Sequence, residues 1–186
     1  KQEEQMVADV RALSDAMNFI EAKIAVEGKN FDIEKYKGLL DLKTQAVYEF
    51  NISSLGSETG QFAWPVEPKV GISAYFHDPN YPGIFGVQHQ AIDIPTYQGT
   101  PIRAAGDGVV YTTRDNGYGY SYIILAHAGK FMTVYGHMSG ILVEAGQKVL
   151  KGSIIGLSGG MPGTKGAGYM TTGPHLHFEL LMSGMH

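Results

Sequence analysis

The sequence predicts a mainly antiparallel β domain that is preceded by an α-helical hairpin or a segment of coiled coil. The helical part is indicated by apolar residues that recur at alternating steps of four and three between Met6 and Ile24. The β part is indicated by short β-branched and aromatic runs after residue 61, which alternate with glycine-containing turns. Between the two parts, residues 51–61 lose the helical repeat and are the expected linker.

The helical arm is defined here as residues 1–50. Its first helix is expected over residues 2–26, and Gly28 to Asn30 would form the turn to a second amphipathic helix. One apolar seam runs along the first helix: Met6, Val10, Leu13, Met17, Ile20 and Ile24. A spacer or a dimerisation element is the simpler interpretation of this arm, and an active regulatory role is the alternative.

The second domain is expected to comprise residues 62–186 and to contain no helix. Hairpin turns are indicated at Asp107-Gly108, Asn116-Gly117 and Ala128-Gly129. The predicted strands are residues 102–105, 109–114, 122–127, 131–137, 149, 153–157 and 175–182. A long glycine-rich segment, residues 159–173, leads into the last strand and is either the wall or lid of a site or a plain connection.

Charge and composition exclude several kinds of partner and site. Residues 61–186 carry seven Lys or Arg and seven Asp or Glu, so this part lacks the basic surface of a nucleic-acid binder. The chain has no cysteine, so a metal would be held by His, Asp or Glu. No apolar run approaches the ~20 residues that cross a bilayer. Because the chain begins at Lys1, targeting or anchoring segments further upstream would not be seen.

Two short patterns supply candidate metal ligands. His175 and His177 alternate on the last predicted strand, so both imidazoles lie on one face of a sheet. On an extended segment His89 and Asp93 would also share a face, over the small Ala91. Two imidazoles and a carboxylate suit Zn²⁺ and leave a fourth position open, as in catalytic sites. Either histidine of the pair could be the third ligand.

His137 ends a predicted strand and is a candidate for proton transfer or for stabilising an oxyanion. The chain has no HExxH motif, so a helix-borne glutamate base is absent and histidines would do that work. The histidine of the pair that does not bind the metal would be its partner. For His137 taken alone, a hydrogen-bonded histidine of the core is the simpler interpretation.

Three ordered motifs resemble those of the lysostaphin-like (LytM-type) zinc metallopeptidases, peptidase family M23. They are His89-xxx-Asp93, Tyr135-Gly136-His137-Met138 and Gly173-Pro174-His175-Leu176-His177-Phe178-Glu179. The resemblance covers roughly residues 62–186. It implies an antiparallel β fold with an open groove, an extracytoplasmic location in the periplasm or cell envelope, and hydrolysis of peptide cross-links between the stem peptides of bacterial peptidoglycan. Whether the bond lies beside a D-alanine or within a glycine bridge is left open.

Carried over residue by residue, the resemblance implies one zinc ion per chain, bound by His89, Asp93 and His177. It implies that His137 and His175 serve catalysis, without saying which is the general base. Tyr118 occupies the position of a tyrosine that some relatives place near the substrate.

The chain departs from the family at Ala91, where a glycine is usual, and in the longer segment between Gly160 and Gly173. Glu179 shares the face of the histidine pair and either supports a ligand or is a surface residue at the strand end. His77, His127 and His186 match no ligand of the family and are expected to be incidental.

Three functions are consistent with these observations. The first is a zinc endopeptidase of peptidoglycan, which the presence of all five site residues favours. The second is a non-catalytic LytM-type activator of a cell-wall amidase, acting through its groove and helical arm. The third is an active enzyme whose arm docks into its own groove or onto a cell-division or envelope protein.

Overall fold

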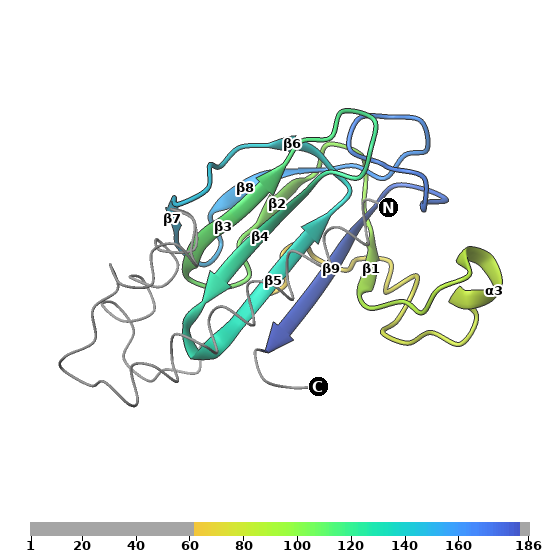
Figure 1. Ribbon diagram of the computed structural model, residues 1–186, viewed down its shortest axis with the longest axis horizontal. Coiled ribbons are helices and arrows are strands. Elements are labelled where there is room, and N and C mark those ends of the chain that lie inside the picture. Colours follow the sequence, from red (N-terminus) through yellow and green to blue (C-terminus); the bar gives the residue numbers. More distant parts are fainter. Residues whose placement is uncertain (1–61, 183–186) are drawn as a thin grey trace, which may run out of the picture.

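The computed structural model describes residues 62–182 (Figure 1). The predicted helical arm, the linker and His186 lie outside these residues, so their predictions stay predictions. The helical elements are α3 (Tyr81–Phe85) and the 3₁₀ turn η3 (Ala128–Lys130). The strands are β1 (Ile92–Pro95), β2 (Pro101–Arg103), β3 (Gly108–Arg114), β4 (Tyr122–His127), β5 (Phe131–Gly136), β6 (Met138–Ile141), β7 (Lys148–Val149), β8 (Ile154–Ser158) and β9 (His175–Met182).

The strands form two antiparallel sheets, which confirms the mainly antiparallel β fold predicted for this part of the chain. The larger sheet has six strands in the order β1-β9-β5-β4-β3-β7, and the smaller has three in the order β2-β8-β6. Every residue of β4 is buried, because this apolar strand lies in the middle of the larger sheet. The predicted strands at residues 122–127 and 175–182 are confirmed with the same bounds.

The prediction that no helix follows residue 61 was wrong. The short helix α3 begins with a proline at its first positions and ends at Gly86, which has the left-handed φ of 75° that commonly closes a helix. A helix of five residues is too short to show a 3.6-residue period in the sequence. Among the described residues, no helix is both long and apolar enough to span a membrane.

Strand β6 was also not predicted, because the chain changes sheets at a single residue. The preceding strand, β5, ends at Gly136 in the larger sheet, and β6 starts at Met138 in the smaller one. His137 between them has φ 57°, in the left-handed region that non-glycine residues seldom adopt. The corner therefore places a histidine where two sheets meet.

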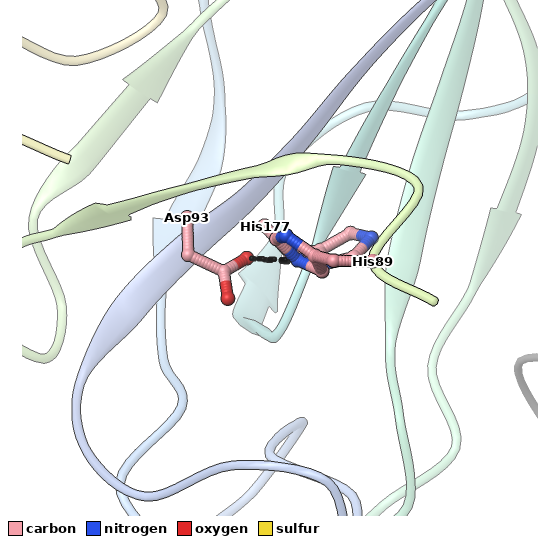
Figure 2. A group of neighbouring side chains, drawn as sticks. All are labelled: His89, Asp93 and His177. Atoms are coloured by element: carbon pink, nitrogen blue, oxygen red, sulfur yellow. Dashed lines mark hydrogen bonds and ion pairs between the residues drawn. The ribbon is translucent and has the colours of Figure 1, made fainter. Parts of the chain in front are cut away.

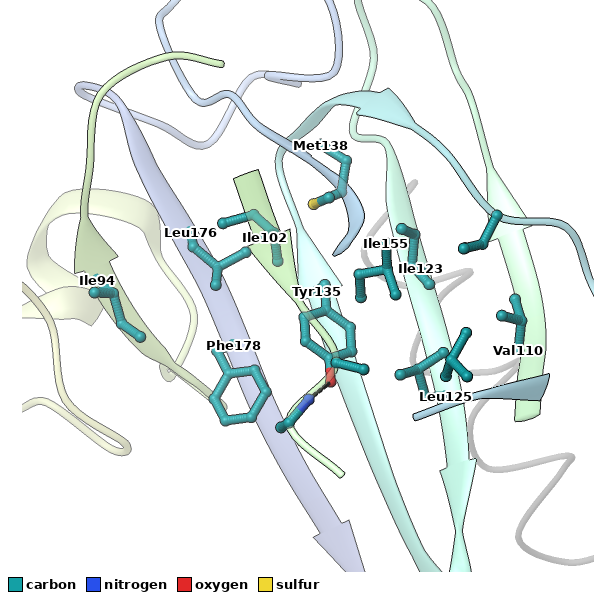
Figure 3. Packing of buried hydrophobic residues seen from close by; sticks show 14 residues of the cluster. Ile94, Ile102, Val110, Ile123, Leu125, Tyr135, Met138, Ile155, Leu176 and Phe178 are labelled. Atoms are coloured by element: carbon teal, nitrogen blue, oxygen red, sulfur yellow. Dashed lines mark hydrogen bonds between the residues drawn. The ribbon is translucent and has the colours of Figure 1, made fainter. Parts of the chain in front are cut away.

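The main core lies between the two sheets (Figure 3). It takes alternate residues from the strands, so Leu176 and Phe178 of β9 point into it. Each fully buried side chain of this size contributes about 1.5–3 kcal/mol to stability. The neighbours His175, His177 and Glu179 consequently face the opposite side of the larger sheet.

His127, expected to be incidental, is part of a buried polar chain in the core. Its Nδ1 lies 2.8 Å from the carbonyl oxygen of Asp107, which can only accept, so Nδ1 carries the proton. Its Nε2 lies 2.6 Å from the Thr133 hydroxyl, which lies 2.9 Å from that of Tyr135. The amide of Ala105 donates to the Tyr135 oxygen. The chain satisfies polar atoms that burial would otherwise penalise.

Candidate metal centre and active site

Strand pairing brings two of the predicted ligands together. Strands β1 and β9 are antiparallel neighbours, and Asp93 lies directly opposite His177 in their register. Residues directly opposite each other on antiparallel strands have side chains on the same face. A carboxylate near the start of the domain therefore meets an imidazole at its end.

His89 reaches the same place by another route than the one predicted. The expectation of an extended segment from residue 89 to residue 93 was wrong, because β1 starts only at Ile92. His89 instead lies in the segment after α3, with its ring stacked on Tyr81 at 4.2 Å between centroids. Its Nδ1 donates to the carbonyl of Tyr75 over 2.9 Å. Helix α3 and residue 75 therefore hold this imidazole in place.

The three side chains form a buried cluster with the donor set of a zinc site (Figure 2). One ligand atom from each of His89, Asp93 and His177 lies within 4.8 Å of the others. Asp93 Oδ1 lies 3.1 Å from His89 Nε2 and 3.1 Å from His177 Nδ1. His89 Nε2 is buried and forms no hydrogen bond to any described residue. A buried lone pair aimed at a carboxylate fits the binding of a cation.

The charges of the cluster also favour a cation. Burial by itself would raise the pKa of Asp93, but the hydrogen bond from His177 and the close approach of the His89 imidazole hold that pKa well below its usual range. Burial would lower the pKa of His177, but hydrogen bonds to Asp93 and Glu179 raise it to about 10. The site therefore stabilises positive charge, whether the charge is a proton or a metal ion.

Glu179 is a buried partner of His177 and not a surface residue. Its side chain is 6% exposed, and its Oε1 lies 3.2 Å from His177 Nε2. This contact is on the opposite nitrogen from the one that faces Asp93. Of the two alternatives for Glu179, the structure therefore favours a carboxylate that orients the candidate ligand His177.

The other two predicted residues, His137 and His175, lie side by side at the same site. Their ring centroids are 4.4 Å apart, and His175 Nε2 lies 3.6 Å from Asp93 Oδ2. His137 Nδ1 donates to the carbonyl of Ala167 over 2.8 Å, and His175 Nδ1 donates to that of Gly173 over 2.7 Å. Both bonds leave Nε2 as the atom with the lone pair.

Burial keeps both histidines in the neutral form. It lowers the pKa of His137 well below 6.5, helped by His175 and His177 nearby. It also lowers the pKa of His175, although Asp93 and the Gly173 carbonyl act in the other direction. Two neutral imidazoles with unprotonated Nε2 atoms can accept protons from a reacting group. All five residues predicted for the site are thus gathered in one place.

Sequence reasoning missed Tyr120, which lies against this cluster. The side chain is 3% exposed, and its ring meets those of His137 and His177 edge-on at 4.9 and 6.0 Å between centroids. The Tyr120 ring fits there because residue 136 is a glycine; a Cβ at that position would overlap the Tyr120 hydroxyl. Tyr118 is 74% exposed, and its predicted contact with substrate stays a prediction. The one hint in the sequence is that Tyr120 lies two residues after Tyr118, in the same glycine-containing turn.

The glycine-rich segment 159–173 is a wall of the site and not a plain connection. It supplies the Ala167 carbonyl that orients His137. The amides of Gly166 and Gly168 donate to the carbonyls of Gly117 and Tyr118, which ties the segment to the turn beside Tyr120. Its position therefore favours the interpretation as a wall or lid over a plain connection. Recognition of the substrate by this segment stays a prediction.

Comparisons with known proteins agree with this geometry. The model of peptidase family M23 matches residues 87–186. The peptidoglycan DD-endopeptidase ShyA of Vibrio cholerae is 42% identical over 124 residues, which are 65% of this chain and 27% of that protein. A zinc-containing peptidase from Vibrio cholerae has a similar structure, with 35% identity and a TM-score of 0.56 over 67% of this chain and 37% of that one.

A catalytic-domain mutant of the prophage-encoded M23 protein EnpA from Enterococcus faecalis is also similar, with 31% identity and a TM-score of 0.51. That match covers 67% of this chain and 90% of the other. The two antiparallel sheets and the buried His-Asp-His cluster are consistent with a metallopeptidase. The chain belongs to peptidase family M23. The matched part spans about a quarter of the length of ShyA.

Proposed function

We propose that this chain is a zinc-dependent endopeptidase that hydrolyses peptide cross-links of bacterial peptidoglycan. The observation that carries the proposal is the placement of two separate groups at one site. His89, Asp93 and His177 form a buried cluster with a cation's donor set, and the imidazoles of His137 and His175 lie beside it. A binding protein that only activates a partner would not need neutral, oriented histidines next to such a cluster.

In the proposed reaction each residue has a role that its contacts support. His89, Asp93 and His177 would hold one zinc ion, which when bound acts as a Lewis acid that polarises a carbonyl and activates a water. His137 or His175 would take a proton through Nε2 and return it to the leaving amine. The other, once its Nε2 has taken up a proton, would donate a hydrogen bond from that atom to the oxyanion as it forms. Ala167 and Gly173 hold both rings for these steps.

The substrate class is supported by the relatives. Several of them, including ShyA and ShyC of Vibrio cholerae, are named peptidoglycan DD-endopeptidases. That name supports a stem-peptide cross-link over a glycine bridge, and it supports action outside the cytoplasm, where peptidoglycan lies. The alternative of a non-catalytic amidase activator is not favoured, because all five site residues are present and converge.

The experiment that tests the proposal combines metal analysis with product analysis. Purified protein is expected to contain about one zinc per chain by elemental mass spectrometry. It is also expected to split cross-linked muropeptide dimers of sacculi into monomers, which are measured after a muramidase has cut the glycan strands. His177→Ala is expected to lose both properties, whereas His77→Ala, outside the cluster, should retain both. Wild-type protein that binds no metal and leaves sacculi intact would end the endopeptidase proposal.

A further inference from the structure

The larger sheet carries a second apolar cluster on the face that does not pack against the smaller sheet. We call it the outer cluster. Its buried members are Val109, Tyr120, Tyr122, Ile124, Ala126, Met132 and Val134, and Tyr111 and Leu181 pack against them. All of these residues belong to β3, β4, β5 and β9 or to the turn before β4. Within residues 62–182, this cluster therefore takes its hydrophobic side chains from one layer only.

The outer cluster continues the face that bears the metal centre. Side chains two residues apart on a strand share a face, so the strand register defines successive rows. Each row contains residues that lie opposite one another on neighbouring strands. The row at the metal centre is Asp93, His177, Gly136 and Tyr122. The next row outward is Glu179, Val134 and Ile124, and the outermost is Leu181, Met132 and Ala126. The polar site occupies one end of this face, and the rest of it is apolar.

The depth of burial on this face requires a second layer. Ile124 and Val134 are 0% exposed, and Met132 is 2% exposed. One face of a sheet cannot remove its own side chains from water, and stable domains cover it with helices or another sheet. An apolar face that extends over several strands is larger than most proteins leave in contact with water.

The described chain starts at the end of the larger sheet where the outermost row of the outer cluster lies, although Phe62 itself packs against the main core on the other face. The Phe62 ring packs edge-on against His127 at 5.1 Å and Phe131 at 5.5 Å, at the turn between β4 and β5. The outermost row of the outer cluster, with Ala126 and Met132, adjoins that turn. A helix of 25 residues is about 37 Å long, whereas six strand residues span only about 20 Å. The preceding chain can therefore cover the whole face.

We propose that the helical arm, residues 1–50, packs its apolar seam on the outer cluster and forms the second layer of the larger sheet. The seam offers one continuous apolar stripe, which is what a sheet face binds when a helix covers it. The predicted linker, residues 51–61, can extend to about 36 Å and lets the arm turn back from Phe62 onto the face. The arm and the sheet each present an apolar surface that needs a partner.

Thiol labelling of the full chain tests this proposal, since the chain has no cysteine of its own. Val134→Cys reports on the outer cluster, and Leu180→Cys reports on the other face of β9, where the residue is 49% exposed. The Val134→Cys thiol is expected to react at least about tenfold more slowly than the control thiol. Leu13→Asp with Ile20→Asp, on the seam, should abolish most of this difference. Ala8→Asp with Ala22→Asp, on the opposite side of the predicted helix, should leave it in place.

Three outcomes would overturn the proposal. The Val134→Cys thiol could react as fast as the control, which would mean that the face is open. It could react slowly even in the Leu13→Asp with Ile20→Asp variant, which would mean that another segment covers the face. It could become fast on dilution as a dimer dissociates in sedimentation, which would assign the cover to a second copy. Leu181→Cys, at the half-buried edge of the cluster, is the second reporter if Val134→Cys does not fold.

Discussion

The Nε2 atom of His177 lies 3.2 Å from Oε1 of the buried Glu179, at the far side of the ring from the metal centre. Both residues are on β9, two positions apart, so strand alternation alone puts them on one face. Because the carboxylate occupies Nε2, Nδ1 is the nitrogen left to face Asp93. Glu179 is thus expected to set both the orientation and the basicity of this ligand.

Replacing Glu179 should weaken metal binding without removing a ligand. Glu179→Ala is expected to lower zinc affinity by about 10–100-fold, because His177 loses the group that orients it. Glu179→Gln should cost less, since its amide oxygen can still accept from Nε2. Competition with a chromogenic chelator measures both affinities, and Glu144→Ala, an exposed carboxylate away from the site, is the control. Unchanged affinity in Glu179→Ala would reduce Glu179 to a packing role.

The two remaining site histidines should affect turnover and not metal content. His137→Ala and His175→Ala are each expected to lower kcat for muropeptide cleavage by about 10²–10⁴-fold, because each removes a group for proton transfer or oxyanion stabilisation. Zinc content should stay near one per chain, because neither is in the His-Asp-His cluster. Loss of zinc in either variant would instead make that histidine a ligand, and full activity would remove its catalytic role.

The shared face of the histidine pair could be predicted because it depends on a local rule, whereas the set of three candidate ligands was implied only by the family resemblance. Alternation on β9 puts His175 and His177 on one face whatever the rest of the chain does, and family resemblance then separated their roles. Predictions failed where a contact between distant segments decides the conformation. His137 turns the corner between sheets only because Met138 pairs with β8, and no periodicity in the sequence records that change.

Other residues could not be assigned from sequence for the same reason. Tyr120 reaches the site only because β5 places Gly136, a residue without a side chain, beside it. The role of His127 depends on Thr133, its neighbour across β4 and β5, and on the carbonyl of Asp107. Each of these contacts joins segments whose proximity is set by strand register, which a single sequence leaves undetermined.

The space beside Gly136 can be tested by filling it. Gly136→Ala would place a Cβ on the Tyr120 hydroxyl, so the ring must leave its contact with His137 and His177 or the strand must shift. We expect a loss of about 1–3 kcal/mol in the free energy of unfolding and a lower kcat. Gly83→Ala, where an added Cβ meets no atom within 4 Å, is the matched control for urea denaturation. Equal stability of the two variants would contradict the close packing of Tyr120.

The buried His127 predicts a loss of stability in acid. Burial lowers its pKa below the ordinary value of 6.5, so the folded protein binds fewer protons here than the unfolded chain. Its contribution is therefore present above about pH 6.5 and is lost as the pH falls below that value. His127→Gln should cost about 1–3 kcal/mol at pH 7.5 through its broken hydrogen bonds, and less at pH 5. Urea denaturation with chelator present measures the difference, and a gap that is constant with pH would contradict a neutral His127.

An arm that covers the outer cluster should also limit access to the metal centre, because both lie on one face of the larger sheet. The seam pair Leu13→Asp with Ile20→Asp is then expected to raise the rate of cross-link cleavage in sacculi by about three- to tenfold, by shifting the population toward an open face. The pair Ala8→Asp with Ala22→Asp adds the same charge on the opposite side of the helix and should leave the rate unchanged. If the seam pair exposes the Val134→Cys thiol but leaves turnover unaltered, the arm packs on the sheet without restricting substrate. A rise in turnover without that exposure would place the restriction elsewhere.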